Sequence, residues 1–342
     1  MKKLFILGNG FDIASGLPTK YDDFRDWFIN NHELDYDRLN RIVKKSVEEG
    51  SDLSELSIPE ERINPKGDIY YDEKEFAEFF YILVEYANYC NRNDVTWRDF
   101  ESNLPKLPFD KFGDSDYNYT NFIDYGEDDD FKHAEDVEQL GTNLAYMITN
   151  SVSKYFAQWI KSISIKEKDI HTKKLIVDNK QDSVFLVFNY TNLLEKIYKI
   201  PDNQICNIHG SLLEGNRLIF GHGEKMSDND DFDPFDISCY TIEAKNALRK
   251  RTDEIISNYR SFFENLGTLE EIYIIGWNLS DPNYVDAPYL QEVVSHTNED
   301  TIIYFDKHDE QKQQDYKNTC ICNGFKGKFG ISDSKKDEKF II

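Results

Sequence analysis

The sequence predicts an α/β protein whose parallel sheet is interrupted by a large, mainly helical insertion. Short apolar runs typical of buried strands occur at the start of the chain and again only after residue 170. Helical stretches separate several later runs, and strands that alternate with helices are typical of parallel sheets with crossover connections. We therefore expect residues 1–30 and 170–325 to form one sheet domain, residues 31–169 to form the insertion, and residues 326–342 to form a C-terminal tail.

The apolar runs define the expected strands. They span residues 3–8, 183–188, 205–208, 217–220, 271–275 and 301–305. The first run ends at Gly8 and precedes a helical spacing of aromatic residues over 19–28. Further helices are expected within residues 241–266 and 284–295, so the first strand should join the sheet that the later strands form.

The insertion is predicted to be helical because its apolar residues recur at helical spacing. One stripe covers residues 76–87 and a longer one covers residues 144–160. The acidic, tyrosine-rich stretch at residues 105–130 has the composition of a loop. The charged segment 332–338 is expected to fray as part of the tail.

The charge balance limits the classes of ligand. The chain has 342 residues, of which 64 are acidic and 40 basic, giving a formal net charge of −24. Such a surface repels phosphate backbones, so we expect no broad nucleic-acid interface. A nucleotide pocket remains compatible with this charge, because backbone amides at a helix N-terminus bind phosphate without basic side chains. The acidic clusters at 128–130 and 228–236 are interpreted as solvated loops.

Cysteine usage and hydropathy favour a reducing, cytoplasmic setting. The five cysteines are scattered and include no Cys-x-x-Cys pair: Cys90, Cys206, Cys239, Cys320 and Cys322. We therefore expect neither a disulfide framework nor a bound metal. The first apolar run is too short for a signal peptide, and no stretch has the length of a membrane span. Whether the chain forms a homo-oligomer is left open.

The most distinctive motif is GNGFDIASGLP at residues 8–18, where the first strand meets a helix. Gly8 and Gly10 allow the backbone to approach a ligand, and the helix N-terminus directs amides toward a phosphate. The third glycine of the usual G-x-G-x-x-G pattern is replaced by Ile13. An ordinary strand-to-helix turn is the alternative interpretation.

Polar residues also follow two later strands. In FNYT, Asn189 offers both a donor and an acceptor, although Asn189 or Thr191 could equally cap the next helix. In IHG, His209 is suited to proton transfer, although a lone histidine is more often a structural hydrogen-bonding group. His222, in FGHGE, is a weaker candidate of the same kind.

A fourth motif, GWNLSD, begins at Gly276 after another apolar run and includes Asn278 and Asp281, the latter a potential helix cap. Because the carboxyl ends of parallel strands meet at one edge of a sheet, we expect the four motifs to lie together. Asn189 and His209 should then share one pocket opposite the opening glycine turn.

In this order, the motifs resemble the sirtuin-like NAD-binding fold, which has a Rossmann-like sheet. The resemblance implies that Asn189 and His209 act in catalysis, by orienting water or binding the ribose hydroxyls. Asp12, just past the glycine turn, is expected to stabilise positive charge on the ribose. The residues expected to bind the cofactor are Gly8, Asn9, Gly10, Phe11, Ser15, Pro18, Thr191, Gly276, Asn278 and Asp281.

The chain is more closely similar to the AbiH family of bacteriophage abortive infection proteins. The similarity rests on GNGFD-x-x-x-GLPT at residues 8–19, on Trp97 followed by Phe100 and Glu101, and on the three later motifs. It implies an antiphage role with an unspecified phage trigger. The chain lacks the four-cysteine zinc site of sirtuin deacylases, which disfavours lysine deacylation, and Thr191 stands where an aspartate is frequent.

The implied reaction is hydrolysis of NAD to nicotinamide and ADP-ribose without a metal. Cleavage passes through a cation at ribose C1 and needs a dry pocket with a positioned water. One alternative is a non-catalytic module that binds NAD or a nucleotide signal. Another is a metal-dependent phosphoesterase, whose histidine motifs IHG and FGHGE resemble, although no Asp-x-His or Asn-His pair stands at a strand end. A third is a structural interaction protein that acts through its helical insertion.

Overall fold

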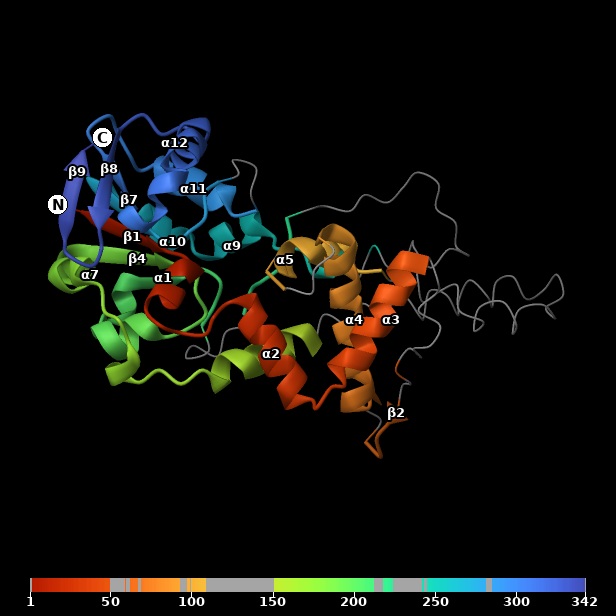
Figure 1. Ribbon diagram of the computed structural model, residues 1–342. Helices are drawn as coiled ribbons and strands as arrows, with labels where there is room; N and C mark the ends of the chain where they lie inside the picture. Colours follow the sequence, from red (N-terminus) through yellow and green to blue (C-terminus); the bar gives the residue numbers. More distant parts are fainter. Residues whose placement is uncertain are drawn as a thin grey trace, which may run out of the picture. The chain divides into compact units, whose positions relative to one another are not determined.

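Figure 1 shows the computed structural model of the chain. It describes residues 2–49, 59, 62–66, 69–92, 97–98, 100–108, 151–211, 218–223, 242, 245–280 and 285–341. Asp281, Cys239 and the acidic clusters at 128–130 and 228–236 lie outside the described residues.

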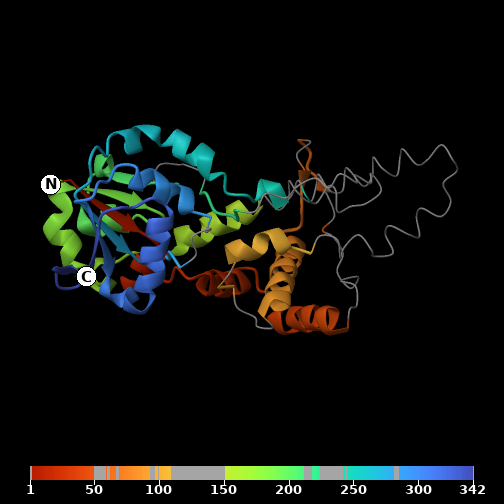
Figure 2. The same ribbon diagram turned by 90° about the horizontal axis from the view of Figure 1, so that it is seen from above.

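The chain divides into two compact units. The sheet unit comprises Met1–Lys20, Ile160–Ile219 and Lys250–Ile342. The helical unit comprises Tyr21–Trp159 and Phe220–Arg249. The predicted insertion at 31–169 thus belongs almost entirely to the helical unit. This unit also includes residues 21–30 and the later segment Phe220–Arg249. Both ends of the chain lie in the sheet unit (Figure 2).

Seven strands of the described residues form one sheet in the order β5-β4-β1-β6-β7-β8-β9. They are β1 (Lys3–Leu7), β4 (Ser183–Val187), β5 (Ile205–Asn207), β6 (Glu271–Ile275), β7 (Ile302–Asp306), β8 (Lys328–Asp333) and β9 (Glu338–Ile341). β1 pairs in parallel with both β4 and β6, and only the β8–β9 pair is antiparallel. The predicted parallel sheet, which holds both residues 3–8 and 183–188, is confirmed, and the structure shows that these two strands are neighbours.

Helices cover both faces of this sheet, which explains why its central strands are apolar throughout. In β1, Leu4 and Ile6 enter one core, whereas Phe5 and Leu7 enter the other. One face carries α1 (Asn9–Ala14) and α7 (Lys174–Asn179). The opposite face carries α9 (Thr252–Asn258), α10 (Arg260–Glu264), α11 (Ala287–Val294) and α12 (Gln313–Cys322) (Figure 1).

Two segments differ from the prediction. The expected tail at 326–342 supplies β8 and β9, and β8 extends the sheet from Ile302↔Lys328 to Asp306↔Ser332. Its charged residues suggested a frayed end, but alternate side chains of a strand near a sheet edge face solvent while the others are buried. The expected strand at 217–220 is irregular in its described part, although Leu218 and Phe220 are buried there.

The helical unit confirms the two predicted helical stripes where they are described. Its described helices are α2 (Tyr21–Asn31), α3 (Tyr36–Glu49), α4 (Glu73–Arg92) and α5 (Phe100–Asn103), and residues 151–159 are also helical. A two-stranded sheet pairs β2 (Arg62–Ile63) with β3 (Ile69–Tyr70). The described core of this unit is rich in aromatic side chains, which include Phe24, Phe28, Phe80, Trp97, Phe100, Tyr155, Phe156 and Trp159.

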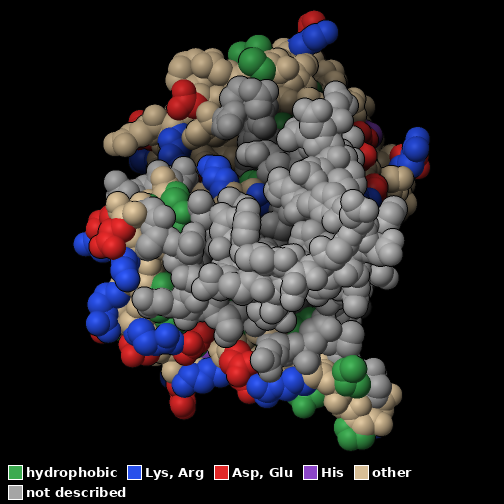
Figure 3. All heavy atoms as spheres, turned by 90° about the vertical axis from the view of Figure 1, so that its right-hand side faces the viewer, with side chains coloured by type: hydrophobic (Ala, Val, Ile, Leu, Met, Phe, Trp, Pro, Cys, Tyr) green, Lys and Arg blue, Asp and Glu red, His purple; other side chains and the backbone are tan. Residues whose placement is uncertain are grey.

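The described surface carries both signs of charge. Figure 3 shows Lys and Arg side chains interspersed with Asp and Glu side chains over the described part of one face. In the helical unit such charges pair across short distances, as between Arg62 and Glu75 at 3.2 Å. Exposed pairs of this kind contribute about 0–1 kcal/mol each, so they reflect a solvated surface more than a source of stability. Among the described helices, none combines the length and apolar character that a membrane crossing requires.

Candidate functional site

The four motifs lie where the sequence predicts them, at the carboxyl ends of neighbouring strands. Gly8 follows β1, Asn189 follows β4, His209 follows β5 and Gly276 follows β6. These strands are adjacent in the order β5-β4-β1-β6, and the chain reverses its direction of progress across the sheet between β1 and β6. In open parallel sheets, ligands bind outside the carboxyl ends of the strands at such a reversal.

Asp12 lies at the centre of this edge. It belongs to α1, directly after β1, and is 1% exposed. Asn189 Nδ2 donates a hydrogen bond to Asp12 Oδ1 over 2.6 Å, and Thr191 Oγ1 donates to Oδ2 over 2.7 Å. The structure therefore brings together three predicted site residues, although Asn189 is 177 positions from Asp12 in the chain.

The environment of Asp12 moves its ionisation to neutral pH. Burial raises the pKa of the Asp12 carboxyl to about 7, because the charged form loses its hydration inside the protein. The hydrogen bonds from Thr191 and Asn189 lower the pKa, and the negative charge of Glu195 raises it further. Asp12 therefore changes charge close to pH 7, which suits a group that accepts a proton or stabilises a cation.

Asn189 has a side-chain oxygen beside Asp12, a hydrogen-bond acceptor to which no described residue donates. Its Oδ1 is buried and receives no hydrogen bond from any of them. Leaving such an oxygen unsatisfied costs about 1–3 kcal/mol, so each instance requires an explanation. A ligand hydroxyl or a water molecule that donates to Oδ1 would supply one.

His209 belongs to a second polar cluster. Its Nε2 lies 3.6 Å from Asp286 Oδ1, and Lys250 Nζ lies 3.3 Å from the same oxygen. All three side chains are at most 4% exposed. The rings of Phe188 and Tyr190, which flank Asn189 in sequence, contact the His209 ring at centroid distances of 5.1 and 6.1 Å.

The two clusters use different sides of the residues that follow β4. Phe188 and Tyr190 face His209, whereas the Asn189 side chain turns to Asp12 in α1. The described polar partners of Asn189 and His209 are therefore different residues, and the single pocket for both stays a prediction.

Sequence reasoning missed Asp286 and Lys250. Asp286 occupies the N-cap position of α11, where an aspartate normally accepts hydrogen bonds from the first turn, but its side chain makes no such bond. Lys250 lies in the sequence LRKRTDE, where a lysine is expected to be solvated. Neither position has a local pattern that distinguishes it, because their roles arise from contacts with distant segments.

The glycine turn packs first against another loop. The amides of Gly8 and Gly10 donate to the carbonyls of Ile275 and Gly276, both over 3.0 Å. A Cβ atom at Gly276 would lie 2.2 Å from the amide nitrogen of Phe11, and one at Gly8 would lie 2.5 Å from the Gly276 oxygen. The Phe11 amide also donates to Gly8, over 2.8 Å. Two early amides of α1 are thus already bonded within the chain, which leaves fewer for a phosphate than the motif predicts.

Two of the other predicted binding residues stabilise local turns. Asn9 Nδ2 donates to the Thr19 carbonyl over 2.7 Å, which closes the loop after α1. Asn278 Oδ1 accepts a hydrogen bond of 2.8 Å from Ser280 Oγ in the loop after β6. Both asparagines are exposed and so remain accessible at the same edge.

The remaining predicted residues differ in accessibility. Phe11 and Ser15 are buried, and the Phe11 ring contacts Tyr198 at 6.0 Å between centroids. Phe11 therefore serves the core beneath α1. Pro18 is exposed on the loop after α1, and Asp281 lies outside the described residues.

Trp97 and Glu101, which belong to the family pattern, have structural contacts within the helical unit. Trp97 Nε1 donates to Glu85 Oε1 over 3.2 Å. Glu101 accepts hydrogen bonds from the Tyr21 hydroxyl and, over 3.2 Å, from the Gly221 amide. These residues therefore tie α2, α4 and α5 to the loop at 220–223.

Metal binding gains no support from the described part of the chain. It contains no group of three or more His, Cys, Asp or Glu residues arranged to hold a metal ion. His222 Nε2 lies 2.8 Å from the Lys245 carbonyl oxygen, a hydrogen bond that a metal would have to displace.

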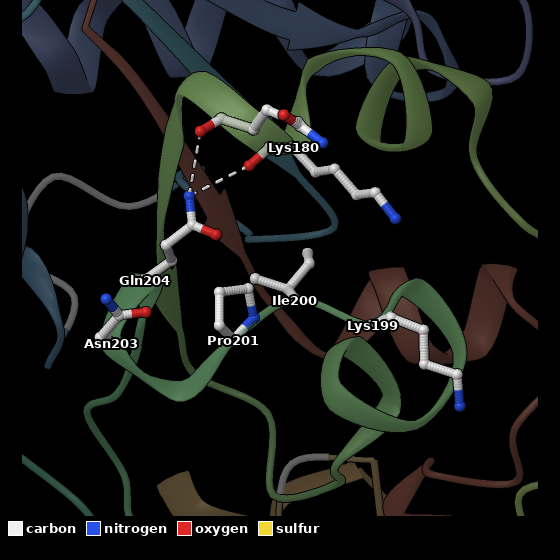
Figure 4. A pocket seen from close by; sticks show the side chains of 7 residues that line it. Lys180, Lys199, Ile200, Pro201, Asn203 and Gln204 are labelled. Atoms are coloured by element: carbon white, nitrogen blue, oxygen red, sulfur yellow. Dashed lines mark hydrogen bonds between the residues drawn. The ribbon is translucent and has the colours of Figure 1, made fainter.

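A surface hollow of about 410 Å³ lies at the opposite, amino edge of the sheet, before β4 and β5 (Figure 4). Lys180 and Lys199 line it, but their ammonium groups donate to the carbonyls of Tyr198 and Lys196. Gln204 donates to the backbone carbonyls of Lys180, Gln181 and Ser183, at the start of β4. Because this hollow lies away from the carboxyl ends of the strands, it is not a candidate for the predicted site.

Comparison with known proteins identifies one family. The model of the family described as "Bacteriophage abortive infection AbiH" matches residues 4–306, from β1 to the end of β7. The match includes both polar clusters and the glycine turn. No curated protein and no solved structure matches the chain significantly.

Proposed function

This chain belongs to the AbiH family of bacteriophage abortive infection proteins, and we propose that it acts against phage by binding NAD at the carboxyl edge of its sheet and hydrolysing it. The products would be nicotinamide and ADP-ribose. The observation that carries the proposal is the buried cluster of Asp12, Asn189 and Thr191, whose carboxyl group ionises close to pH 7.

The cluster provides what cleavage of an N-glycosidic bond requires. As the bond between ribose C1 and nicotinamide breaks, nicotinamide departs as a neutral molecule and positive charge develops on the ribose. The Asp12 carboxylate would stabilise that charge, and its effect is strong because the site excludes water. Water then adds to C1, and its proton passes to Asp12 or to solvent.

Asn189 fits a ribose-binding role because of how its amide is used. Nδ2 already donates to Asp12, so Oδ1 is directed elsewhere and can accept a hydrogen bond from a ribose hydroxyl or from the attacking water. Thr191 holds the other carboxylate oxygen of Asp12 by a second donated hydrogen bond. This arrangement keeps the carboxylate in one orientation, which is the main requirement for electrostatic stabilisation.

The topology of the sheet supports a dinucleotide as the ligand. Numbered along the chain, the six parallel strands lie in the order 3-2-1-4-5-6, which is the order of doubly wound dinucleotide-binding sheets. Asp12 follows the first strand, beside the reversal where such ligands bind. This supports a Rossmann-like site, with the exposed Asn9, Pro18 and Asn278 available for the adenosine side.

The test measures nicotinamide release from NAD by purified protein, and NAD content in cells before and after phage infection, since infection supplies the trigger. Asp12→Asn and Asn189→Ala should reduce cleavage by about 10²-fold or more. Asn179→Ala is the matched control, because Asn179 is also hydrogen-bonded but lies at the amino edge of the sheet. It should cleave NAD like the unaltered chain.

Two outcomes would contradict hydrolysis. If NAD binds without release of nicotinamide, in vitro and during infection, the chain is a non-catalytic NAD sensor. If folded Asp12→Asn protein protects cells and depletes NAD as well as the unaltered chain, the site lies elsewhere.

A further inference from the structure

Two buried side chains of opposite charge, Asp306 and Lys173, lie at the carboxyl end of β7, two strands from β1 in the sheet. Asp306 is the last residue of β7 and pairs in register with Ser332 of β8. Lys173 directly precedes α7, whose first turn is joined to the chain just past β8 by a hydrogen bond of 3.1 Å from the Leu175 amide to the Ser334 carbonyl. Strand pairing and this hydrogen bond bring both residues to one corner of the sheet unit.

Each of these side chains has a polar group that no described residue satisfies. Asp306 is 7% exposed, and its Oδ1 accepts a hydrogen bond of 2.9 Å from the His308 amide, whereas its buried Oδ2 receives none. Lys173 is 4% exposed, and its described hydrogen bonds are all made by its backbone, so its ammonium group donates to no described residue. Such groups are costly to bury, most of all when they are charged, so their placement requires an explanation.

The charges of Asp306 and Lys173 act on one another across a short gap. Burial lowers the pKa of Lys173, and the carboxylate of Asp306 is the largest of the effects that raise it. Lys335 and Asp333 also act on Lys173, in opposite directions. A group placed between the two side chains would have to accept from the ammonium and donate to Asp306 Oδ2. A hydroxyl group does both, because it carries one donor and two acceptor lone pairs.

The place of this pair in the sheet fits the second ribose of a dinucleotide. Doubly wound sheets bind a ribose hydroxyl through an acidic residue in their first half. In this chain the residue after the second strand, β4, is Asn189, whose Nδ2 already donates to Asp12. Asp306 offers a carboxylate on the far side of β6 instead. The ends of β1 and β7 are about 10 Å apart at the usual strand spacing, which leaves room for the pyrophosphate that joins two riboses.

From this geometry we propose that Asp306 and Lys173 form a subsite that binds the hydroxyls of the adenosine ribose of NAD and selects NAD against NADP. The inference rests on the proposed function, because it names a subsite for that ligand. Asp306 Oδ2 accepts from a ribose hydroxyl, and Lys173 Nζ donates to a hydroxyl oxygen. NADP carries a 2′-phosphate at this ribose, which has no proton to donate and brings negative charge against the Asp306 carboxylate.

The test measures binding without turnover. The full-length chain is titrated in a calorimeter with ADP-ribose and with ADP-ribose 2′-phosphate, which carry the adenosine riboses of NAD and NADP but no nicotinamide. The unaltered chain should bind ADP-ribose more tightly. Asp306→Asn keeps an acceptor for the His308 amide but presents N–H donors where Oδ2 stood. It should weaken ADP-ribose binding about tenfold and tighten binding of the 2′-phosphate, so that the preference is lost or reversed.

Asp300→Asn is the matched control for Asp306→Asn, because Asp300 is exposed before the opposite end of β7, and it should bind both ligands like the unaltered chain. Lys173→Met removes the donor and leaves the Asp306 carboxylate unbalanced. It should therefore weaken binding of both ligands, and of the 2′-phosphate more strongly. Lys174→Met alters the neighbouring, exposed lysine and should change neither affinity. Should Asp306→Asn fail to fold, Lys173→Met and its control decide.

The proposal would be overturned if the unaltered chain bound both ligands equally or bound neither. Folded Asp306→Asn protein with the original preference would overturn it as well. Nicotinamide release from NAD is followed in parallel, which separates this result from the proposed function. If the affinities change as expected and no nicotinamide is released, the subsite holds and hydrolysis fails. If NAD is cleaved but Asp306→Asn leaves both affinities unchanged, hydrolysis holds and the subsite fails.

Discussion

At the scale of single residues, Asp12 combines burial, two donated hydrogen bonds and a pKa near neutrality. In an unfolded chain its carboxyl would ionise near its ordinary value of 3.8, whereas the folded protein keeps the proton up to about pH 7. Between these values the folded state binds more protons than the unfolded state, so the free energy of unfolding falls as pH rises. A buried group retained at such a cost is more typical of function than of stability.

Asp12→Asn should remove this pH dependence. The amide can still accept from Asn189, and it can donate to the Thr191 hydroxyl, so the packing is preserved. Between pH 5.5 and 8, the unaltered chain should lose roughly 2 kcal/mol of stability relative to the variant. Urea denaturation at the two pH values measures this. Asp253→Asn, at an exposed position, is the control and should show no such difference; equal pH slopes for Asp12→Asn and the unaltered chain would refute the raised pKa.

Thr191 should determine the pH below which the activity falls, because it donates a hydrogen bond to Asp12. If the Asp12 carboxylate assists NAD cleavage, kcat/KM should fall as pH drops through about 7. Thr191→Val removes a hydrogen bond that lowers the Asp12 pKa, so this limb should move upward by about one pH unit. Thr191→Ser keeps the donor and should leave the limb in place. A profile that stays flat from pH 6 to 8 in active protein would exclude Asp12 from the reaction.

At the scale of elements, the loops after β1 and β6 determine where the site can form. Their backbones approach so closely that a side chain at either glycine position would meet backbone atoms of the other loop. Gly8 and Gly10 are interpreted from the sequence as positions where the backbone approaches a ligand. The close contact between the two loops already explains why glycine is needed at Gly8, Gly10 and Gly276. It places α1, and with it Asp12, against the end of β4.

Gly276→Ala should therefore destabilise the protein strongly. Its φ is +67°, and the added Cβ would lie 2.2 Å from the Phe11 nitrogen, a backbone atom that cannot move alone. We expect a loss of about 3 kcal/mol or more in the free energy of unfolding. Gly267→Ala is matched in backbone conformation, with φ of +57° and its nearest atom 3.7 Å away, and should cost only about 1 kcal/mol. Similar losses for both variants, measured by urea denaturation, would contradict the close loop contact.

At the scale of the whole molecule, neither unit is one continuous stretch of the chain. The sheet unit is assembled from three separate segments, so its sheet forms only when these three segments come together. The last segment matters because β8 covers the edge of β7 and β9 covers β8. Within the sheet, the Phe329 ring stacks on Phe305 at 5.7 Å between centroids.

Deletion of residues 326–342 tests whether this segment is an integral part of the sheet or a dispensable tail. Removal of β8 would leave one side of β7 unpaired over five register positions. At about 1 kcal/mol for each lost backbone hydrogen bond, the loss is on the order of 5 kcal/mol, comparable with the whole stability of a domain. The truncated chain should be largely unfolded or aggregated by circular dichroism and size-exclusion chromatography. A truncated chain as stable as the full one would show that the segment is dispensable.

The sequence by itself determined the local features. Apolar runs identified the five strands β1, β4, β5, β6 and β7, helical spacing identified the insertion, and the motifs marked the carboxyl ends of four strands, because each of these signals lies within a few consecutive residues. The more polar strands β8 and β9 carried no such signal. Only the tertiary structure decided which side chains meet. Asp12 reaches Asn189 and Thr191 across the chain, and Asp286 reaches His209 and Lys250 in place of capping its own helix. Such partners depend on strand order and on loops packing against each other, and those long-range contacts leave no pattern within a single segment.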